Sequence, residues 1–216
     1  PSVVISSAAA ANAVMLGGGY FNPLRGYMNL VDVLSVAERM QMYSGLLWPT
    51  PVINLLKGDL VSEEIKSAGK ITLRDPNIEG NPVIAIQSVD NIETISKEQI
   101  GIVSEQIYGT SSFEHPGVAE FVDSGDTLIS GPIEVLNYSY FSTDFPDTFK
   151  TAVEIRNEIK ERGWESVVAF QTRNPMHRAH EELCRMAQKE LNADGILVHM
   201  LLGKLKKGDI PAEVWN

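Results

Sequence analysis

The chain has 216 residues, of which 44% are hydrophobic and 21% charged, so it can form one large or two modest domains with substantial cores. Its formal net charge is −10, and the acidic excess lies in residues 1–149, which hold 7 basic and 18 acidic side chains, against 11 and 10 in residues 150–216. This balance argues against nucleic-acid binding, which depends on Lys and Arg neutralising phosphates.

The sequence predicts no membrane segment, because no apolar run approaches the roughly 20 residues that span a bilayer. The first residues lack the basic region that begins a signal peptide. Cys184 is the single cysteine, which excludes an intrachain disulfide framework and fits a reducing compartment. We therefore expect a cytoplasmic protein.

Residues 1–136 have the pattern of a β-rich domain. The glycines at 17–19 predict a tight turn and not a phosphate loop, since no Lys-Ser/Thr pair follows them. Apolar periodicity predicts a helix over 31–43 and a weaker one over 97–108. Short apolar segments between turn residues predict strands at 51–56, 70–73 and 82–86.

The remaining segments alternate between helix and strand. A helix is predicted over 147–161, with Phe149, Val153 and Ile159 facing inward and Gly163 as its stop. The continuous apolar run at 167–170 then predicts a strand that is covered on both faces.

A second helix and a parallel strand should follow this run. Asn174 can cap the helix and Pro175 fits its first turn. One apolar face should pack back on the sheet; it comprises Ala179, Leu183, Met186 and Ala187. After the turn at 192–195, the apolar run at 196–201 predicts a strand parallel to the first, which completes a βαβ unit.

The loop between strand and helix carries the residues best suited to chemistry. In open α/β sheets, ligands bind beyond the carboxyl ends of the strands, where a helix N-terminus favours anions. Arg173 offers a planar fork of donors for a tetrahedral oxyanion, and Gln171 adds an uncharged donor. His177 and His180 should project from the same side of the helix. No side chain is placed as a covalent nucleophile, so the pattern favours direct transfer between bound anions.

Less specific explanations remain open for several residues. The two histidines could be surface residues, and a zinc site is disfavoured because only His115, His199 and one cysteine could complete it. His199, in an apolar strand, is typical of a hydrogen-bonded core histidine, and His115 of a loop residue. The role of a basic cluster stays open between a solvated face and polyphosphate contact; it comprises Lys204, Lys206 and Lys207.

Residues 171–181, QTRNPMHRAHE, resemble the signature of the ATP sulfurylase family, including the His-x-x-His pair of nucleotidyltransferases. Further segments resemble this family in the same order along the chain: 18–28, 73–76, 80–82, 115–118 and 207–211. The resemblance implies two domains, a PUA-like β-rich domain at 1–136 and the start of a Rossmann-like α/β nucleotidyltransferase domain at 137–216. The family's downstream Gly-Arg-Asp-His-Ala-Gly-type segment has no match, so we expect a fragment cut at both ends.

The resemblance also implies an activity, sulfate adenylyltransferase, which converts ATP and sulfate to adenosine 5′-phosphosulfate and pyrophosphate, or the reverse. Its catalytic residues would be Thr172, Arg173, Asn174, His177 and His180. Gln171 and Arg173 would bind sulfate, and the nucleotide would be bound by Gln171, Asn174, His177 and His180. No protein metal site is implied, because Mg²⁺ would arrive with ATP.

The resemblance leaves some questions open. The physiological direction, the activity of this chain and its oligomeric state do not follow from it, although a homo-oligomer is expected. Two alternatives also remain, another His-x-x-His nucleotidyltransferase and an inactive fragment that acts as a binding module.

Overall fold

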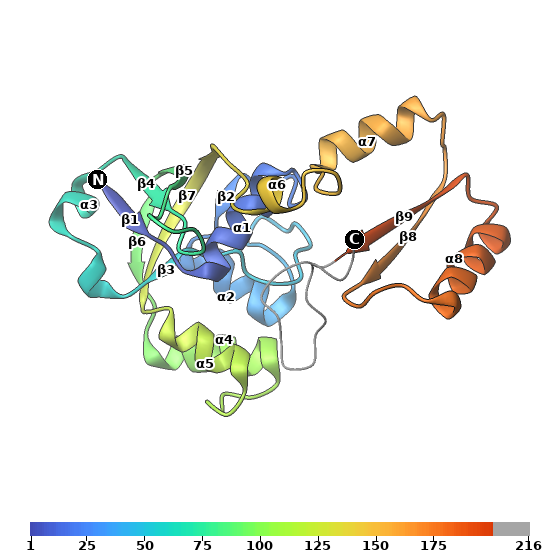
Figure 1. The fold of residues 1–216 in the computed structure, drawn as a ribbon. Coiled ribbons are helices and arrows are strands. Elements are labelled where there is room, and N and C mark those ends of the chain that lie inside the picture. Colours follow the sequence, from blue (N-terminus) through green and yellow to red (C-terminus); the bar gives the residue numbers. More distant parts are fainter. Residues whose placement is uncertain (201–216) are drawn as a thin grey trace. The chain divides into compact units, whose positions relative to one another are not determined.

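The computed structural model describes residues 1–200, and contacts divide the chain into two units, Pro1–Ala152 and Val153–Asn216 (Figure 1). None of the helices within the described residues is long and apolar enough to cross a membrane.

The first unit is built on a sheet of seven strands with the order β1-β4-β5-β7-β2, in which β3 and β6 also pair with β7. Only the β1–β4 pair is parallel among these described strands. The strands are β1 (Ser2–Val4), β2 (Gly26–Tyr27), β3 (Leu55–Leu56), β4 (Lys70–Arg74), β5 (Val83–Ser88), β6 (Asn91–Thr94) and β7 (Thr127–Val135).

Strand β7 is the centre of the sheet, because it pairs with four strands along its length. Its first half pairs with β3 and β6, and its second half with β2 and β5. Gly131 lies between the halves with φ of +137°, a conformation that side chains disfavour. A Cβ at Gly26 would lie 2.0 Å from the Gly131 carbonyl oxygen, so both glycines are needed where β2 meets β7.

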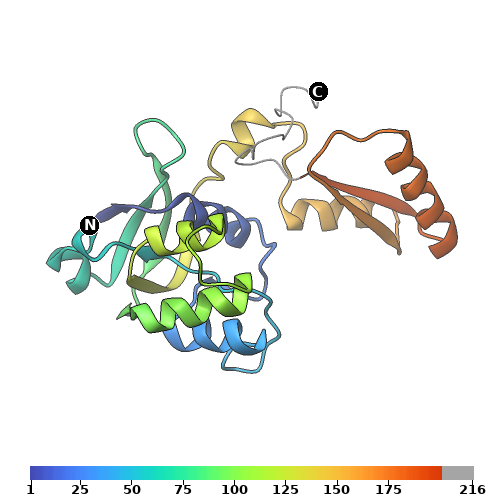
Figure 2. The ribbon, with the colours of Figure 1, turned by 90° about the horizontal axis from the view of Figure 1, so that it is seen from below.

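Helices surround this sheet, and Figure 2 shows α2, α4 and α5 grouped together. Helix α1 packs closely because Ala9, Ala10 and Ala13 are buried, and the Tyr27 hydroxyl donates to the Ala9 carbonyl at 2.8 Å. The helical segments are α1 (Ser7–Gly17), α2 (Leu30–Arg39), the 3₁₀ turn η1 (Gly58–Leu60), α3 (Glu63–Ser67), α4 (Lys97–Tyr108), α5 (Pro116–Asp123) and α6 (Phe141–Asp144).

The structure confirms some of the predicted elements of this unit and corrects others. Strands β4 and β5, helix α4 and the turn after α1 are as expected. The helix predicted over 31–43 ends at Arg39, because Met40 adopts a left-handed conformation with φ of +50°. Of the strand predicted at 51–56, only Leu55–Leu56 forms. Helices α1 and α5 were not predicted.

A buried amide pair links the residue before β3 to strands β5 and β7 in the core. Asn54 and Gln87 are fully buried. The Asn54 Nδ2 donates to Gln87 Oε1 at 2.9 Å, and Gln87 Nε2 donates to the Ile129 carbonyl at 2.9 Å. The Gln87 amide therefore accepts the hydrogen bond from Asn54 and also anchors the pair to β7.

We expect Gln87→Leu to lower the free energy of unfolding by about 1–3 kcal/mol, because it leaves a buried Asn54 donor without its acceptor. Urea denaturation measures this change. The control is Gln106→Leu on the exposed surface of α4, which should change stability by less than about 0.5 kcal/mol. Equal effects of the two substitutions would contradict a structural role for the amide pair.

Residues that follow the predicted boundary after residue 136 still contact the first unit. Residues 137–152 pack on this unit: the Tyr20 hydroxyl donates to the Lys150 carbonyl, and Ala152 N donates to the Gly18 carbonyl at 2.8 Å. Phe149 contacts Tyr138 and Phe141. The structural division therefore falls after Ala152.

The second unit has a strand–helix–strand arrangement, as predicted. Strands β8 (Val167–Thr172) and β9 (Gly195–Met200) pair in parallel, and α8 (Arg178–Leu191) connects them. Figure 1 shows α8 running alongside the two strands. The preceding helix α7 (Ala152–Glu161) begins later than the predicted 147–161, and Phe149 lies outside it. Val153 is 54% exposed, so its predicted inward orientation is wrong.

Candidate functional site

The residues predicted to form a site lie where β8 ends and the chain passes to α8. Thr172 is buried, and its hydroxyl donates to the Asn174 carbonyl at 2.7 Å and accepts from Asn174 N at 3.2 Å. This local turn fixes the backbone on both sides of Arg173. The side chain of Arg173 is exposed at the turn.

The helix after this turn starts later than predicted. His177 is its N-cap, and its Nδ1 accepts from Ala179 N at 3.3 Å. The predicted cap at Asn174 and first turn at Pro175 are therefore wrong, because Asn174 is held in the turn with Thr172. Since Nδ1 accepts, a neutral His177 carries its proton on Nε2, which leaves that N–H for another acceptor.

The two histidines come together, as predicted. The His177 and His180 rings are stacked, with centroids 3.9 Å apart. The His180 ring also contacts Phe170 on β8, at 5.5 Å between centroids. His180 Nδ1 is buried and has no hydrogen-bond partner within the described part of the chain. One imidazole nitrogen of each histidine is thus without a described partner.

Gln171 and His199 form a second pair that the sequence analysis did not predict. They are register partners in β8 and β9, and Gln171 Nε2 lies 3.5 Å from His199 Nδ1. Strand alternation directs Gln171 away from the face that carries Phe170. His199 was expected in a core, but it is only half-buried. Only the strand register, with Gln171 opposite His199, reveals this pair.

The face that α8 turns toward the sheet differs from the predicted one. Cys184 is the buried residue of α8, whereas Leu183 and Met186 are more than half exposed. The helix is rotated by about one residue, about 100°, from the prediction. Strand β8 is also not covered on both faces by described residues, because Ala169 and Gln171 are exposed.

The opposite end of the two strands is fixed by a turn. The Asp194 carboxylate accepts from Glu165 N at 2.7 Å and from Ser166 N at 2.9 Å. These two backbone hydrogen bonds lower the pKa of Asp194 below its usual value of 3.8. A Cβ at Gly195 would lie 2.3 Å from the Trp164 ring, which explains the glycine there.

We expect Asp194→Asn to destabilise the second unit at neutral pH. Because the folded pKa is lowered, the carboxylate contributes stability above the unfolded pKa and loses it as the pH falls through the folded pKa. The difference between wild type and variant should therefore shrink once the pH drops below 3.8. Hydrogen exchange at the Glu165 and Ser166 amides, followed against pH in both proteins, measures this difference in stability. A difference that does not depend on pH would contradict this assignment.

Other residues singled out in the sequence lie apart from this site. His115 is the N-cap of α5 and its ring contacts Tyr108, while Arg185 pairs with Glu181 at 2.5 Å. Residues 1–200 contain no group of three His, Cys, Asp or Glu side chains that could hold a metal ion. The basic cluster at 204–207 lies outside the described residues.

The fold and the site together define a β-rich unit followed by a parallel α/β segment with polar side chains at the carboxyl end of its first strand. A family model described as a PUA-like domain matches residues 1–138, and one described as ATP-sulfurylase matches residues 146–215. The chain therefore belongs to the PUA-like family, and its second part carries an ATP-sulfurylase segment. The predicted fold class is confirmed.

The chain is also similar to proteins named sulfate adenylyltransferase. It is 62% identical to that of Alcanivorax borkumensis and 60% identical to that of Allochromatium vinosum, in both cases over 99% of this chain and 53% of the relative. The relative from the Riftia pachyptila sulfur-oxidizing endosymbiont is 56% identical, over 99% of this chain and 48% of that protein. The chain thus spans about half the length of these curated relatives.

A solved structure shares the fold. It is described as a hexameric APS kinase from Thiobacillus denitrificans, with a TM-score of 0.66 and 21% identity over 97% of this chain and 36% of that one. At this identity the likeness concerns the fold alone.

Proposed function

We propose that the chain is part of a sulfate adenylyltransferase, which joins sulfate to the adenylyl group of ATP and releases pyrophosphate, or runs the reverse reaction. The observation that carries the proposal is the turn at Thr172–Asn174 with the stacked histidines beside it, in a chain 62% identical to a protein of that name.

Sulfate would be held by Arg173 and Gln171. A guanidinium presents parallel N–H donors that match two oxygens of a tetrahedral anion. Gln171 Nε2 has two N–H groups, and its contact with His199 uses at most one of them. The second can donate to sulfate, so His199 would position the Gln171 amide.

The nucleotide phosphates would contact the histidine pair. His177 Nε2 is a donor when Nδ1 accepts from Ala179 N, and it lies at the N-terminus of α8, where the helix dipole favours anions. Asn174, held by Thr172, would complete the nucleotide contacts, and His180 would stabilise charge beside His177.

The reaction needs no covalent enzyme intermediate. A sulfate oxygen attacks the α-phosphorus of ATP, the bond from that phosphorus to the bridging oxygen breaks, and pyrophosphate leaves with the electron pair. The protein residues hold the two anions in line and stabilise the charge that develops. Mg²⁺ would enter as part of MgATP, because this ion keeps several waters and binds substrate phosphate oxygens more than protein cages.

The proposal also covers the compartment, the oligomeric state and the substrates of the protein. We propose a cytoplasmic homo-oligomer that acts on ATP, sulfate, adenylylsulfate and pyrophosphate. Light scattering of the purified protein measures the oligomeric state.

Sulfate-dependent release of pyrophosphate from MgATP tests the activity, in this chain and in a protein of the relatives' length that contains it. Chlorate should compete with sulfate. Pyrophosphate release from the longer protein that is independent of sulfate would instead support another nucleotidyltransferase, and no release would contradict the proposed activity.

A further inference from the structure

The first unit contains a cavity of about 160 Å³ that the proposed reaction does not use. It lies between α1, the segment before β3, the end of α4 and α5. Its apolar wall includes Ile53, Leu55 and Phe121, and its polar groups include Asn12, Tyr108 and Glu120. All the lining residues belong to the first unit.

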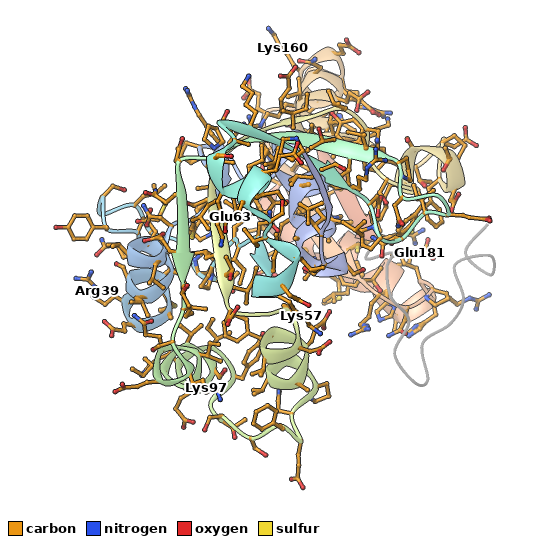
Figure 3. All side chains as sticks on the ribbon, turned by 90° about the vertical axis from the view of Figure 1, so that its left-hand side faces the viewer. Arg39, Lys57, Glu63, Lys97, Lys160 and Glu181 are labelled. Atoms are coloured by element: carbon orange, nitrogen blue, oxygen red, sulfur yellow. The ribbon has the colours of Figure 1, made fainter. Side chains whose placement is uncertain are left out.

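The charge in this cavity has one sign. Glu120 is the single ionisable carboxylate among its lining residues, which include no Lys, Arg or His. The cation on the adjoining strand end, Lys57, points toward α5 in Figure 3 but is paired with Asp123, at 3.0 Å. The side-chain carboxylate of Glu120 has no ion-pair or hydrogen-bond partner among the described residues. Glu120 is itself exposed, so a ligand in this cavity meets a solvated negative charge with which no described side chain pairs.

Tyr108 adds a hydrogen-bonding group beside that charge. Burial and the charge of Glu120 raise the pKa of Tyr108 above its usual value of 10.0, so the phenol stays protonated at neutral pH. Its ring is tilted against His115, at 5.1 Å between centroids. The phenol can therefore accept from a ligand N–H or donate to a ligand acceptor.

We propose that this cavity binds a small organic cation with a flat apolar body, whose N–H donors face Glu120 while the body lies against Ile53 and Phe121. A cavity of about 150 Å³ is large enough for benzene. The volume of the cavity thus limits the ligand to a single ring that carries a short cationic group. The site is independent of the adenylyltransferase proposal, because it lies wholly in the first unit.

Titration of ¹⁵N-labelled protein with benzamidine tests the proposal, and benzamide and benzoate serve as the neutral and anionic probes of the same shape. We expect saturable shifts at the Tyr108, Gly117 and Phe121 amides with benzamidine, and weaker binding of benzamide. Benzoate should bind weakest. Equal binding of the three probes, or shifts elsewhere only, would overturn the proposal.

Two substitutions locate the site. Glu120→Gln should weaken benzamidine binding by roughly two- to fivefold, the range for an exposed ion pair. Gly117→Ala places a Cβ 2.6 Å from the Tyr108 ring, so the ring must move and binding should be lost. Gly101→Ala on α4 is the matched control, since an added Cβ there meets nothing within 4 Å. Unchanged binding in both Glu120→Gln and Gly117→Ala would overturn the proposal.

Discussion

Replacing Arg173 by Ala should lower turnover by about a hundredfold or more in a protein of the relatives' length, because it removes a preorganised donor from the transferring anions. The fold should be intact, since Arg173 is exposed and its backbone is held by Thr172 and Asn174. ATP formation from adenylylsulfate and pyrophosphate measures the rate, and circular dichroism measures the fold.

Arg185→Ala is the matched control for this experiment. It removes a guanidinium from α8, where that group pairs with Glu181 on the exposed side of the helix. An exposed pair of this type contributes at most about 1 kcal/mol to stability. The turnover of the Arg185→Ala variant should therefore equal that of the wild type. An Arg173→Ala variant as active as Arg185→Ala would remove Arg173 from the mechanism.

Replacing Thr172 by Val should have the second largest effect, a loss of about a hundredfold in turnover, although Thr172 itself is buried. The substitution keeps the shape but removes the hydroxyl that makes both hydrogen bonds to Asn174. The loop is then free to shift, and misplacement of catalytic groups by about 1 Å is sufficient for such a loss.

Thr172→Ser distinguishes positioning from packing, because it retains the hydroxyl and removes only a methyl group. We expect its turnover to stay close to wild type. If the Ser variant were as slow as the Val variant, the turn would not be the reason for the loss. The same adenylylsulfate and pyrophosphate assay gives both rates.

The sequence was sufficient where local signals and tertiary packing agree. Helix α4 was predicted as the weaker of two helices, and the structure shows a capping box between Ser96 and Gln99 at its start, which reinforces it. Helix α1 was not predicted, because its residues are almost all small and apolar and therefore give no period.

In the candidate site, the sequence predicted where the polar side chains lie along the chain but not all of their geometry. The pairing of His177 with His180 follows from their spacing along one helix end. The start of α8 was misplaced because Asn174 satisfies Thr172 instead of capping the helix. The contact between Gln171 and His199 depends on strand register, which is not visible in either segment alone.

The most direct test is a crystal structure of the protein with adenylylsulfate bound. We predict that the sulfate group contacts Arg173 and Gln171, and that the nucleotide phosphate lies beside His177 and His180. Adenylylsulfate bound at another place, with these four side chains making no contact to it, would contradict the proposed site.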